Sequence, residues 1–256
     1  RNRSSHFHFE IGAHLLDEET LQLLESVPKE MFQFEIGVQS TLPETLQKIG
    51  RRASLERLAE NVRRLRRKDN IHLHLDLIAG LPGEDYRRFL RSLDWTAELG
   101  AHHLQVEPVK LLPGAPLRLQ SQQLGICFDP NPPYSILRSA DINYAELERL
   151  RGISRLLDLL VNSGRFGRLL QLLVRRCGGL STCLEDLDRF WREARYDRGP
   201  QQLRQTCLQV YNYLLQTIPA GELGPYREAL ARDYAHQERV VAGSAPEFFE
   251  FDLSEA

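Results

Sequence analysis

Four short segments of the sequence place side chains that can do chemistry at every second position, with apolar residues between them. The segments are residues 7–11, 31–38, 71–78 and 104–109. On each segment these side chains share one face, which continues to His6 and Gln39 just outside the segments. Its residues are His6, His8 and Glu10; Gln33, Glu35, Gly37 and Gln39; His72, His74 and Asp76; and Gln105 and Glu107. Carboxylates, amides and imidazoles on one face can bind a polar ligand or transfer protons. The spacing therefore predicts a ligand-binding surface.

The elements that must position these side chains are strands alternating with helices. Alternation with period two predicts one strand per segment. The stretches between have helical spacing, and their start signals are Asp17, a capping box from Thr41 to Glu44, and Ser54. A further helix spans residues 84–99 and stops at Gly100. Strands and helices in strict alternation predict right-handed crossovers and a parallel sheet.

The polar face of each strand indicates which parallel architecture this is. Strands of a sheet covered by helices on both faces are apolar almost throughout, and these strands are apolar on one face only. We therefore predict an α/β fold, a partial parallel (βα) barrel of TIM-like type, with helices outside and a polar lumen. Common closed barrels fill their interior with branched apolar side chains, so a polar lining indicates a wider or incompletely closed barrel that holds a ligand.

The pattern changes after the fourth strand. Residues 118–140 contain Gly125 and three prolines without clear periodicity, and helical spacing resumes at Tyr144. We predict a barrel half at residues 1–117, a linker or covering loop at 118–140, and an α-helical domain at 141–256. For the tail after Gly243 a docking strand and a flexible end both stay open.

Composition narrows the class of partner. The 33 basic and 35 acidic side chains leave a formal net charge of −2, so no overall field attracts nucleic acid or anionic lipid. No apolar run approaches the ~20 residues that cross a bilayer, and a cytoplasmic setting with reduced cysteines is expected. The basic run 63–68 is interpreted as a solvated helix surface. The expected partners are a small-molecule cofactor and an unidentified substrate.

Functional groups of parallel barrels gather at the carboxyl ends of the strands, and this chain is distinctive there. The second strand ends in Gly37-Val38-Gln39-Ser40, where glycine lets a ligand approach the backbone and Gln39 offers a donor and an acceptor. The third ends in the turn 76–84, DLIAGLPGE, and the fourth in 112–116, LPGAP.

These residues resemble the radical S-adenosylmethionine enzymes, especially the branch with anaerobic coproporphyrinogen dehydrogenases, methylthiotransferases and cobalamin-dependent members. The resemblance rests on FEIGVQS, an arginine about a dozen residues later, DLIAGLPGE and LLPGAPL, which occur in the order and spacing of the family over roughly residues 6–117. YSILRSADINYAELERL and residues 162–166 are similar to the C-terminal region of members that carry a cobalamin-binding domain before the barrel.

The resemblance implies roles for individual residues. Glu10 matches a carboxylate that contacts the methionine amino group of S-adenosylmethionine, and Arg51 matches an arginine that binds its carboxylate. Gln39 matches a polar residue near the ribose and methionine parts, with Ser40 adding a hydroxyl contact. Asp76 matches an acid near the ribose hydroxyls. The remaining assignments are Ile78 and Gly80 against adenine, and Glu35, His74 and Glu107 toward the substrate.

The chain departs from the family in one respect that concerns activity. The [4Fe-4S] cluster of the family needs three cysteines at CxxxCxxC spacing, and Cys127, Cys177, Cys183 and Cys207 do not provide it. We therefore expect the cluster ligands to lie upstream of Arg1, with no metal ligands in this chain, and we expect the chain alone to be unable to cleave S-adenosylmethionine reductively.

The function predicted on this basis is the cofactor-binding half of a radical S-adenosylmethionine enzyme. The intact protein would generate a 5'-deoxyadenosyl radical, with cobalamin-dependent methyl transfer left open. Two alternatives remain: a non-radical barrel enzyme that uses Glu35, Asp76 and Glu107 as acid and base, and a degenerate barrel that serves as a binding scaffold.

Overall fold

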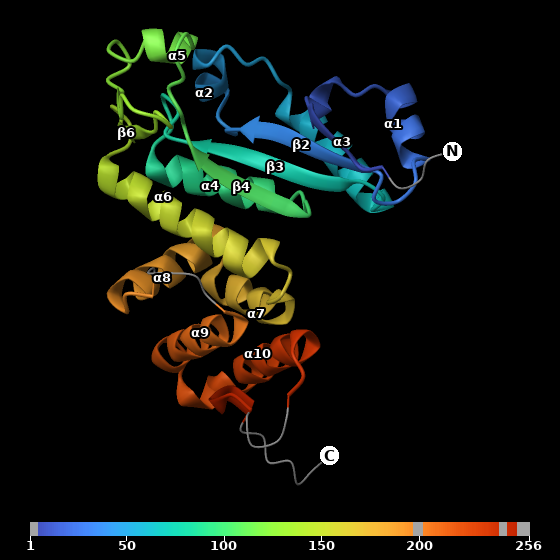
Figure 1. The fold of residues 1–256 in the computed structure, drawn as a ribbon, viewed down its shortest axis with the longest axis vertical. Helices are drawn as coiled ribbons and strands as arrows, with labels where there is room; N and C mark the ends of the chain where they lie inside the picture. Colours follow the sequence, from blue (N-terminus) through green and yellow to red (C-terminus); the bar gives the residue numbers. More distant parts are fainter. Residues whose placement is uncertain (1–4, 197–201, 241–244, 250–256) are drawn as a thin grey trace. The chain divides into compact units, whose positions relative to one another are not determined.

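The computed structural model of this chain describes residues 5–196, 202–240 and 245–249. It divides into two compact units, residues 1–155 and residues 156–256 (Figure 1). The first unit contains the predicted sheet and the second is helical. The predicted division into segments that end at residues 117 and 140 stays a prediction.

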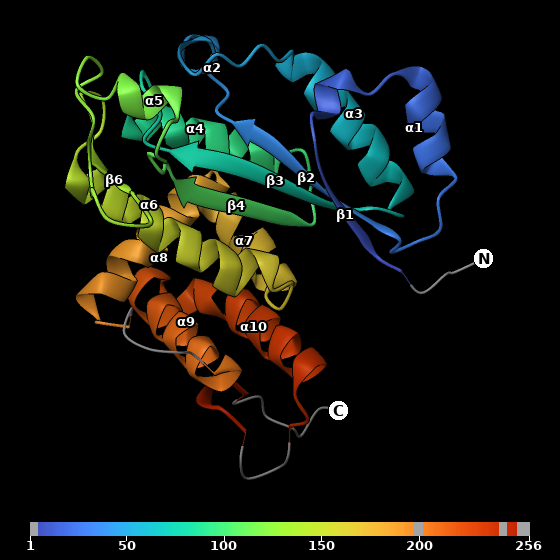
Figure 2. The ribbon, with the colours of Figure 1, turned by 45° about the horizontal axis from the view of Figure 1, so that its top comes forward.

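The first unit is built on a parallel sheet of four strands. These are β1 (Phe7–Ile11), β2 (Phe32–Gln39), β3 (His72–Ala79) and β4 (His103–Pro108), paired in the order β1-β2-β3-β4. Figure 2 shows the strands side by side and running in one direction. Each predicted strand is present, with ends shifted by at most one residue. A sheet in which sequence order equals spatial order, with helices between the strands, confirms the predicted α/β class.

Helices lie in every connection between the strands. Their bounds are η1 Ala13–Leu15, α1 Glu18–Glu25, α2 Pro43–Lys48, α3 Leu55–Lys68 and α4 Tyr86–Ala97. Asp17 and Ser54 cap α1 and α3 as predicted, because their side chains accept hydrogen bonds from Thr20 N and Arg57 N. The predicted capping box at Thr41 is wrong. The N-cap of α2 is Leu42, and the Thr41 hydroxyl instead hydrogen-bonds to Ser92 Oγ at 2.7 Å.

The apolar faces of the strands form the core of this unit. Leu73, Leu75 and Leu77 of β3 are at most 1% exposed, and Phe34, Ile36 and Val38 of β2 are at most 4% exposed. Matching apolar positions of α3 and α4 are buried too: Leu58, Val62, Leu65, Phe89 and Leu93. Burial of such a side chain contributes roughly 1.5–3 kcal/mol. On the edge strand β1, Phe7 and Phe9 stay 47% and 43% exposed.

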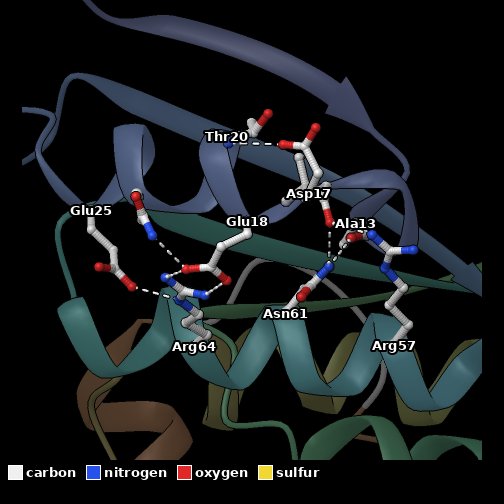
Figure 3. Close-up of polar contacts among 10 residues, drawn as sticks. Ala13, Asp17, Glu18, Thr20, Glu25, Arg57, Asn61 and Arg64 are labelled. Atoms are coloured by element: carbon white, nitrogen blue, oxygen red, sulfur yellow. Dashed lines mark hydrogen bonds and ion pairs between the residues drawn. The ribbon is translucent and has the colours of Figure 1, made fainter.

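Polar contacts fasten the segment after β1 to α3 (Figure 3). Asn61 Nδ2 donates to Ala13 O at 2.8 Å and to Leu16 O at 3.1 Å, which satisfies two backbone carbonyls of the turn. Arg64 pairs with Glu18 and with Glu25 of α1, at 2.5 and 2.7 Å. Part of the basic run thus fixes a neighbouring helix, and is not only solvated as predicted.

The chain after β4 is more ordered than its composition indicates. It forms α5 (Pro116–Leu119) and an antiparallel pair, β5 (Cys127–Phe128) with β6 (Ile136–Arg138). The guanidinium of Arg118 lies over the rings of Phe128 and Tyr134, 4.9 and 5.0 Å from their centroids, and donates to Leu111 O at 2.8 Å. Then α6 (Tyr144–Leu156) begins.

The second unit is helical, as the periodicity predicts. Its elements are the π-helical η2 Leu157–Asn162, α7 Gly167–Cys177, α8 Leu180–Glu193, α9 Leu203–Thr217, η3 Ala220–Glu222, α10 Leu223–Gln237 and η4 Glu247–Phe249. Asp233, 4% exposed, accepts from the backbone of Arg168 and Leu169 at the start of α7. In the tail, Phe248 is buried beside Tyr211 and Tyr234, so this part is neither a strand nor a flexible end. The other tail residues lie outside the described ranges. No helix in the described parts is long and apolar enough to span a membrane.

The division of faces on β3 can be tested by paired truncation. Leu75→Ala should lower the free energy of unfolding by about 2–5 kcal/mol, because it opens a void in the core. His72→Ala, on the opposite and exposed face, should change it by less than about 0.5 kcal/mol. Urea denaturation followed by circular dichroism measures both. Equal losses would contradict the assignment of the faces.

Candidate functional site

A cavity of about 700 Å³ opens at the carboxyl ends of β2, β3 and β4. The strands contribute its polar lining, the end of α2 with the two residues after it contributes a second side, and the segment that contains α5 contributes a third. Its lining residues are Glu35, Gln39, Gln47, Lys48, Ile49, Gly50, Asp76, Ile78, Leu81, Gln105, Glu107, Pro108, Val109, Lys110, Ala115, Pro116, Leu117 and Gln120. The cavity lies where ligands bind in parallel α/β folds.

Strand register arranges the polar face in rows across the sheet. One row is Glu10, Glu35, His74 and His103, the next is Gly37, Asp76 and Gln105, and the last pairs Ile78 with Glu107. Neighbouring strands lie about 4.8 Å apart, so side chains of one row can contact each other. The rows bring Glu35, Asp76 and Glu107 onto one cavity wall.

The carboxylates on this wall oppose one another's ionisation. Burial, followed by the charges of Glu35, Glu10 and Glu107, raises the pKa of Asp76 to about 7. Asp76 is 9% exposed, and its Oδ1 atom has no hydrogen-bond partner among the described residues. A protonated carboxyl is therefore well populated at neutral pH.

Histidine and lysine side chains border this group of acids. His74 Nε2 lies 3.3 Å from Asp76 Oδ1, at the distance of an ion pair. Burial, followed by His103, lowers the pKa of His74, so the imidazole is largely neutral at pH 7 and this contact is polar rather than ionic. Lys110 Nζ lies 3.1 Å from Glu107 Oε2 at the rim of the cavity.

Gln39 takes an unusual backbone conformation at the end of β2. Its φ is 69°, in the left-handed region that costs a non-glycine residue about 1 kcal/mol, and the pairing of β2 with β3 is irregular between Gly37 and Gln39. A Cβ at Gly37 would overlap Gln39 Nε2 and lie 3.3 Å from a terminal nitrogen of Arg51. Glycine at 37 therefore leaves the space that the Gln39 amide occupies.

The predicted site residues divide into those on the cavity and those beside it. Gln39, Asp76, Ile78, Glu35 and Glu107 line the cavity. His74 is adjacent through Asp76, as described above.

The other predicted residues lie behind or beside the lining. Arg51 is half-buried and donates to Gly37 O, one residue from the lining Gly50. Glu10 is exposed on the edge strand next to Glu35. Ser40 is fully buried with its hydroxyl bonded to Glu84, and Gly80, at φ +90°, packs against Ile136. Ser40 therefore does not present its hydroxyl to this cavity.

Several lining residues were not predicted. The end of α2 contributes Gln47 and Lys48, and Ile49 follows the helix directly. The sequence carries no signal for these residues, because a crossover brings them to the cavity. The alternation did place Gln105 on the polar face with Glu107, although no individual role was assigned to it. The turn LPGAP was recognised, and its Ala115 and Pro116 line the cavity.

The cysteines do not form a site for an iron-sulfur cluster. Cys183 and Cys207 are buried on α8 and α9, and burial raises the pKa of each thiol above its ordinary value. Within the described parts of the chain, no three His, Cys, Asp or Glu side chains are grouped as metal ligands. The residues present do not fit a [4Fe-4S] cluster.

Two family models match the chain. Residues 2–96 match the model described as "Radical SAM superfamily", which confirms the predicted resemblance. Residues 122–254, slightly more than half of the chain, match "Protein of unknown function (DUF4080)". The chain belongs to this DUF4080 family. No curated protein matches it.

Solved structures similar to the chain are distant from it. The radical S-adenosylmethionine methyltransferase TsrM from Kitasatospora setae, with tryptophan substrate and aza-SAM bound, gives a TM-score of 0.40 at 19% identity, over 52% of this chain and 27% of TsrM. The same protein with cobalamin and a [4Fe-4S] cluster gives 0.41 at 20%, over 56% and 30%. Coproporphyrinogen III oxidase (HemN) from Escherichia coli gives 0.39 at 13%, over 72% and 70%. The chain thus spans less than a third of TsrM.

Asp76 should make stability depend on pH. Its pKa is raised above the ordinary 3.8, so the folded protein retains a proton that the unfolded chain releases. The free energy of unfolding should then fall as the pH rises from about 4 to about 7. Asp76→Asn should reduce this slope, the remainder coming from Glu84, whose pKa is also raised to about 7, and the exposed Glu56→Gln should leave the slope unchanged. Urea titrations at several pH values measure the slope, and an unchanged slope in Asp76→Asn would refute the assignment.

Gly37→Ala tests the space beside Gln39. The added methyl should displace the Gln39 amide, and because this amide is the end of a flexible side chain, the free energy of unfolding should fall by about 1 kcal/mol or less. Gly224→Ala in α10, where nothing lies within 4 Å of an added Cβ, is the matched control and should cause no loss. Thermal denaturation measures the stability of both proteins, and crystallography shows where the Gln39 amide lies. An unmoved Gln39 amide in Gly37→Ala would contradict the described packing.

Proposed function

We propose that this chain forms the S-adenosylmethionine-binding face of a radical S-adenosylmethionine enzyme. The observation that carries the proposal is the cavity at the carboxyl ends of three consecutive parallel strands, two of which, β2 and β3, lie inside the segment that matches the superfamily. Gln39, Asp76 and Ile78, which the sequence resemblance assigns to the cofactor, all line it.

The proposed roles follow from the chemistry of the cofactor. S-adenosylmethionine carries a sulfonium and an ammonium group, which the carboxylates of Glu35 and Asp76 attract, and Glu10 would receive the ammonium at the open edge of the sheet. Arg51, beside Gln39, would bind the cofactor carboxylate through its planar guanidinium. Ile78 and Leu81 supply apolar surface for adenine, with the backbone around Gly80 behind them.

The proposed reaction needs groups outside this chain. A [4Fe-4S] cluster, when bound in the whole enzyme, would supply the electron for reductive cleavage of the sulfonium. The residues here would bind, orient and enclose the cofactor, while Glu35, His74 and Glu107 would face the substrate. Cobalamin-dependent methyl transfer is one proposed outcome, and hydrogen abstraction by the 5'-deoxyadenosyl radical is another.

A non-radical barrel enzyme is the second candidate function. The raised pKa of Asp76, caused by burial and by Glu35, favours it, since a carboxyl that titrates near neutrality suits acid-base catalysis. Such an enzyme would act in air and without iron. A scaffold that has lost its cluster would instead have no cysteine triplet encoded before Arg1, so the upstream codons separate it from the radical enzyme.

Binding of the cofactor tests the proposal directly. The 256-residue chain should bind S-adenosylmethionine saturably in isothermal titration calorimetry. Arg51→Ala should weaken binding by about 10- to 100-fold, because a hydrogen bond to a charged group contributes about 1.5–3 kcal/mol. Arg67→Ala on the exposed face of α3 is the matched control and should bind as the parent does. No saturable binding by the parent chain, or equal binding by Arg51→Ala, would refute the proposal.

The whole enzyme offers a further check. The N-terminally extended protein, purified without oxygen, should show a cluster signal in electron paramagnetic resonance that changes when S-adenosylmethionine is added. A cluster signal insensitive to the cofactor would contradict the proposed site.

A further inference from the structure

Glu84 is a buried carboxyl in the turn between β3 and α4, and it has no part in the proposed cofactor contacts. It is 1% exposed. Its Oε1 atom accepts a hydrogen bond from Ser40 Oγ at 2.9 Å and another from Ser92 Oγ of α4 at 2.7 Å. One acid thus connects the end of β2, the turn after β3 and the helix that follows.

The network continues into the backbone that follows Gln39. Ser40 Oγ accepts from Leu42 N at 3.1 Å, and Ser92 Oγ accepts from Thr41 N at 3.3 Å. The Ser40 amide donates to Val38 O at 2.9 Å, which closes a tight turn around Gln39. Ser40, Thr41 and Leu42, the three residues after Gln39, are therefore held by hydrogen bonds to Glu84 or to the two serines that it binds.

This anchoring matters because Gln39 is strained. A left-handed backbone at a non-glycine residue persists only where the surroundings hold it. On one side, Gly37 leaves room for the side chain, as described above. On the other side, the fully buried Ser40 fixes the following peptide. The strained residue also lines the cavity.

We infer that Glu84 is a positioning residue of the cofactor site: through Ser40 and Ser92 it holds the end of β2 so that Gln39 keeps its left-handed backbone and presents its amide to the cavity. The inference rests on the proposed function for the identity of the ligand. The geometric part, that Glu84 maintains the conformation of Gln39, stands independently of it.

The network requires hydrogen bonding by Glu84 rather than its negative charge. Burial raises the pKa of Glu84 to about 7, against the opposing effect of the bonds from Ser92 and Ser40. Asp85 raises the pKa further and Arg88 lowers it. Oε2 is buried without a hydrogen-bond partner among the described residues, so an amide nitrogen can replace it without breaking a bond. Glutamine is thus the conservative substitution at this position.

The experiment compares Glu84→Ala, Glu84→Gln and a matched control, Asp233→Asn, in the full chain. Asp233 is also a buried acid that accepts bonds from a helix start, but it lies in the second unit. S-adenosylmethionine affinity is measured by calorimetry, stability by thermal denaturation, and the φ angle of Gln39 by crystallography. Because Glu84→Ala can fail to fold, Ser40→Ala, which removes one hydroxyl, is measured alongside it.

Glu84→Ala or Ser40→Ala should weaken binding about tenfold and release Gln39 from the left-handed region. Glu84→Gln should bind within twofold of the parent, and Asp233→Asn should lose stability without losing affinity. Unchanged affinity and an unchanged Gln39 in a folded Glu84→Ala or Ser40→Ala protein would overturn the inference, as would Glu84→Gln behaving like Glu84→Ala. If the parent chain does not bind S-adenosylmethionine, the proposed function fails, and the crystal structures alone decide: a displaced Gln39 supports the inference and an unmoved one overturns it.

Discussion

The first unit depends on strands that have one apolar and one polar face. The apolar face, with Leu73, Leu75 and Leu77 at its centre, is buried by helices and supplies the free energy of folding. The same pleat necessarily turns the alternate residues to the other side. Parallel register then sets these residues in rows. The packing that stabilises the sheet therefore also brings carboxylates together, although they repel one another. The polar cavity wall is a consequence of how the core is built.

Gathering polar groups in a buried place costs free energy, which is visible as shifted pKa values and as a left-handed backbone. Burial and neighbouring acids keep Asp76 partly protonated near neutral pH, and burial keeps His74 neutral. Gln39 is held in a left-handed backbone between Gly37 and the anchored Ser40. Unsatisfied buried polar atoms and backbone strain concentrate at binding sites, where a ligand can satisfy the first and use the second. Both occur on the wall of one cavity here, which is why the site is assigned to it.

The two family matches cover different parts of the chain. The superfamily match covers residues 2–96, which includes β1, β2, β3 and all of α4 except its last residue, and the DUF4080 match covers residues 122–254. The cavity is lined from both β2–β3 and the segment between the two matches, which holds α5. The part of the chain that defines the family of unknown function therefore follows directly on the part that lines the candidate site.

The sequence by itself determined the strands, the parity of their faces and the helical second part, because periodicity and capping act over a few residues. It also identified Glu35, Gln39, Asp76, Ile78 and Glu107 as inward-facing. Only the tertiary structure decided that Gln47, Lys48 and Ile49 join them, that Ser40 turns away to Glu84, and that Arg64 fastens α1. These three arrangements depend on how a crossover returns to the sheet and on which buried groups find hydrogen-bond partners. Contacts between residues more than forty positions apart leave no periodic pattern in the sequence.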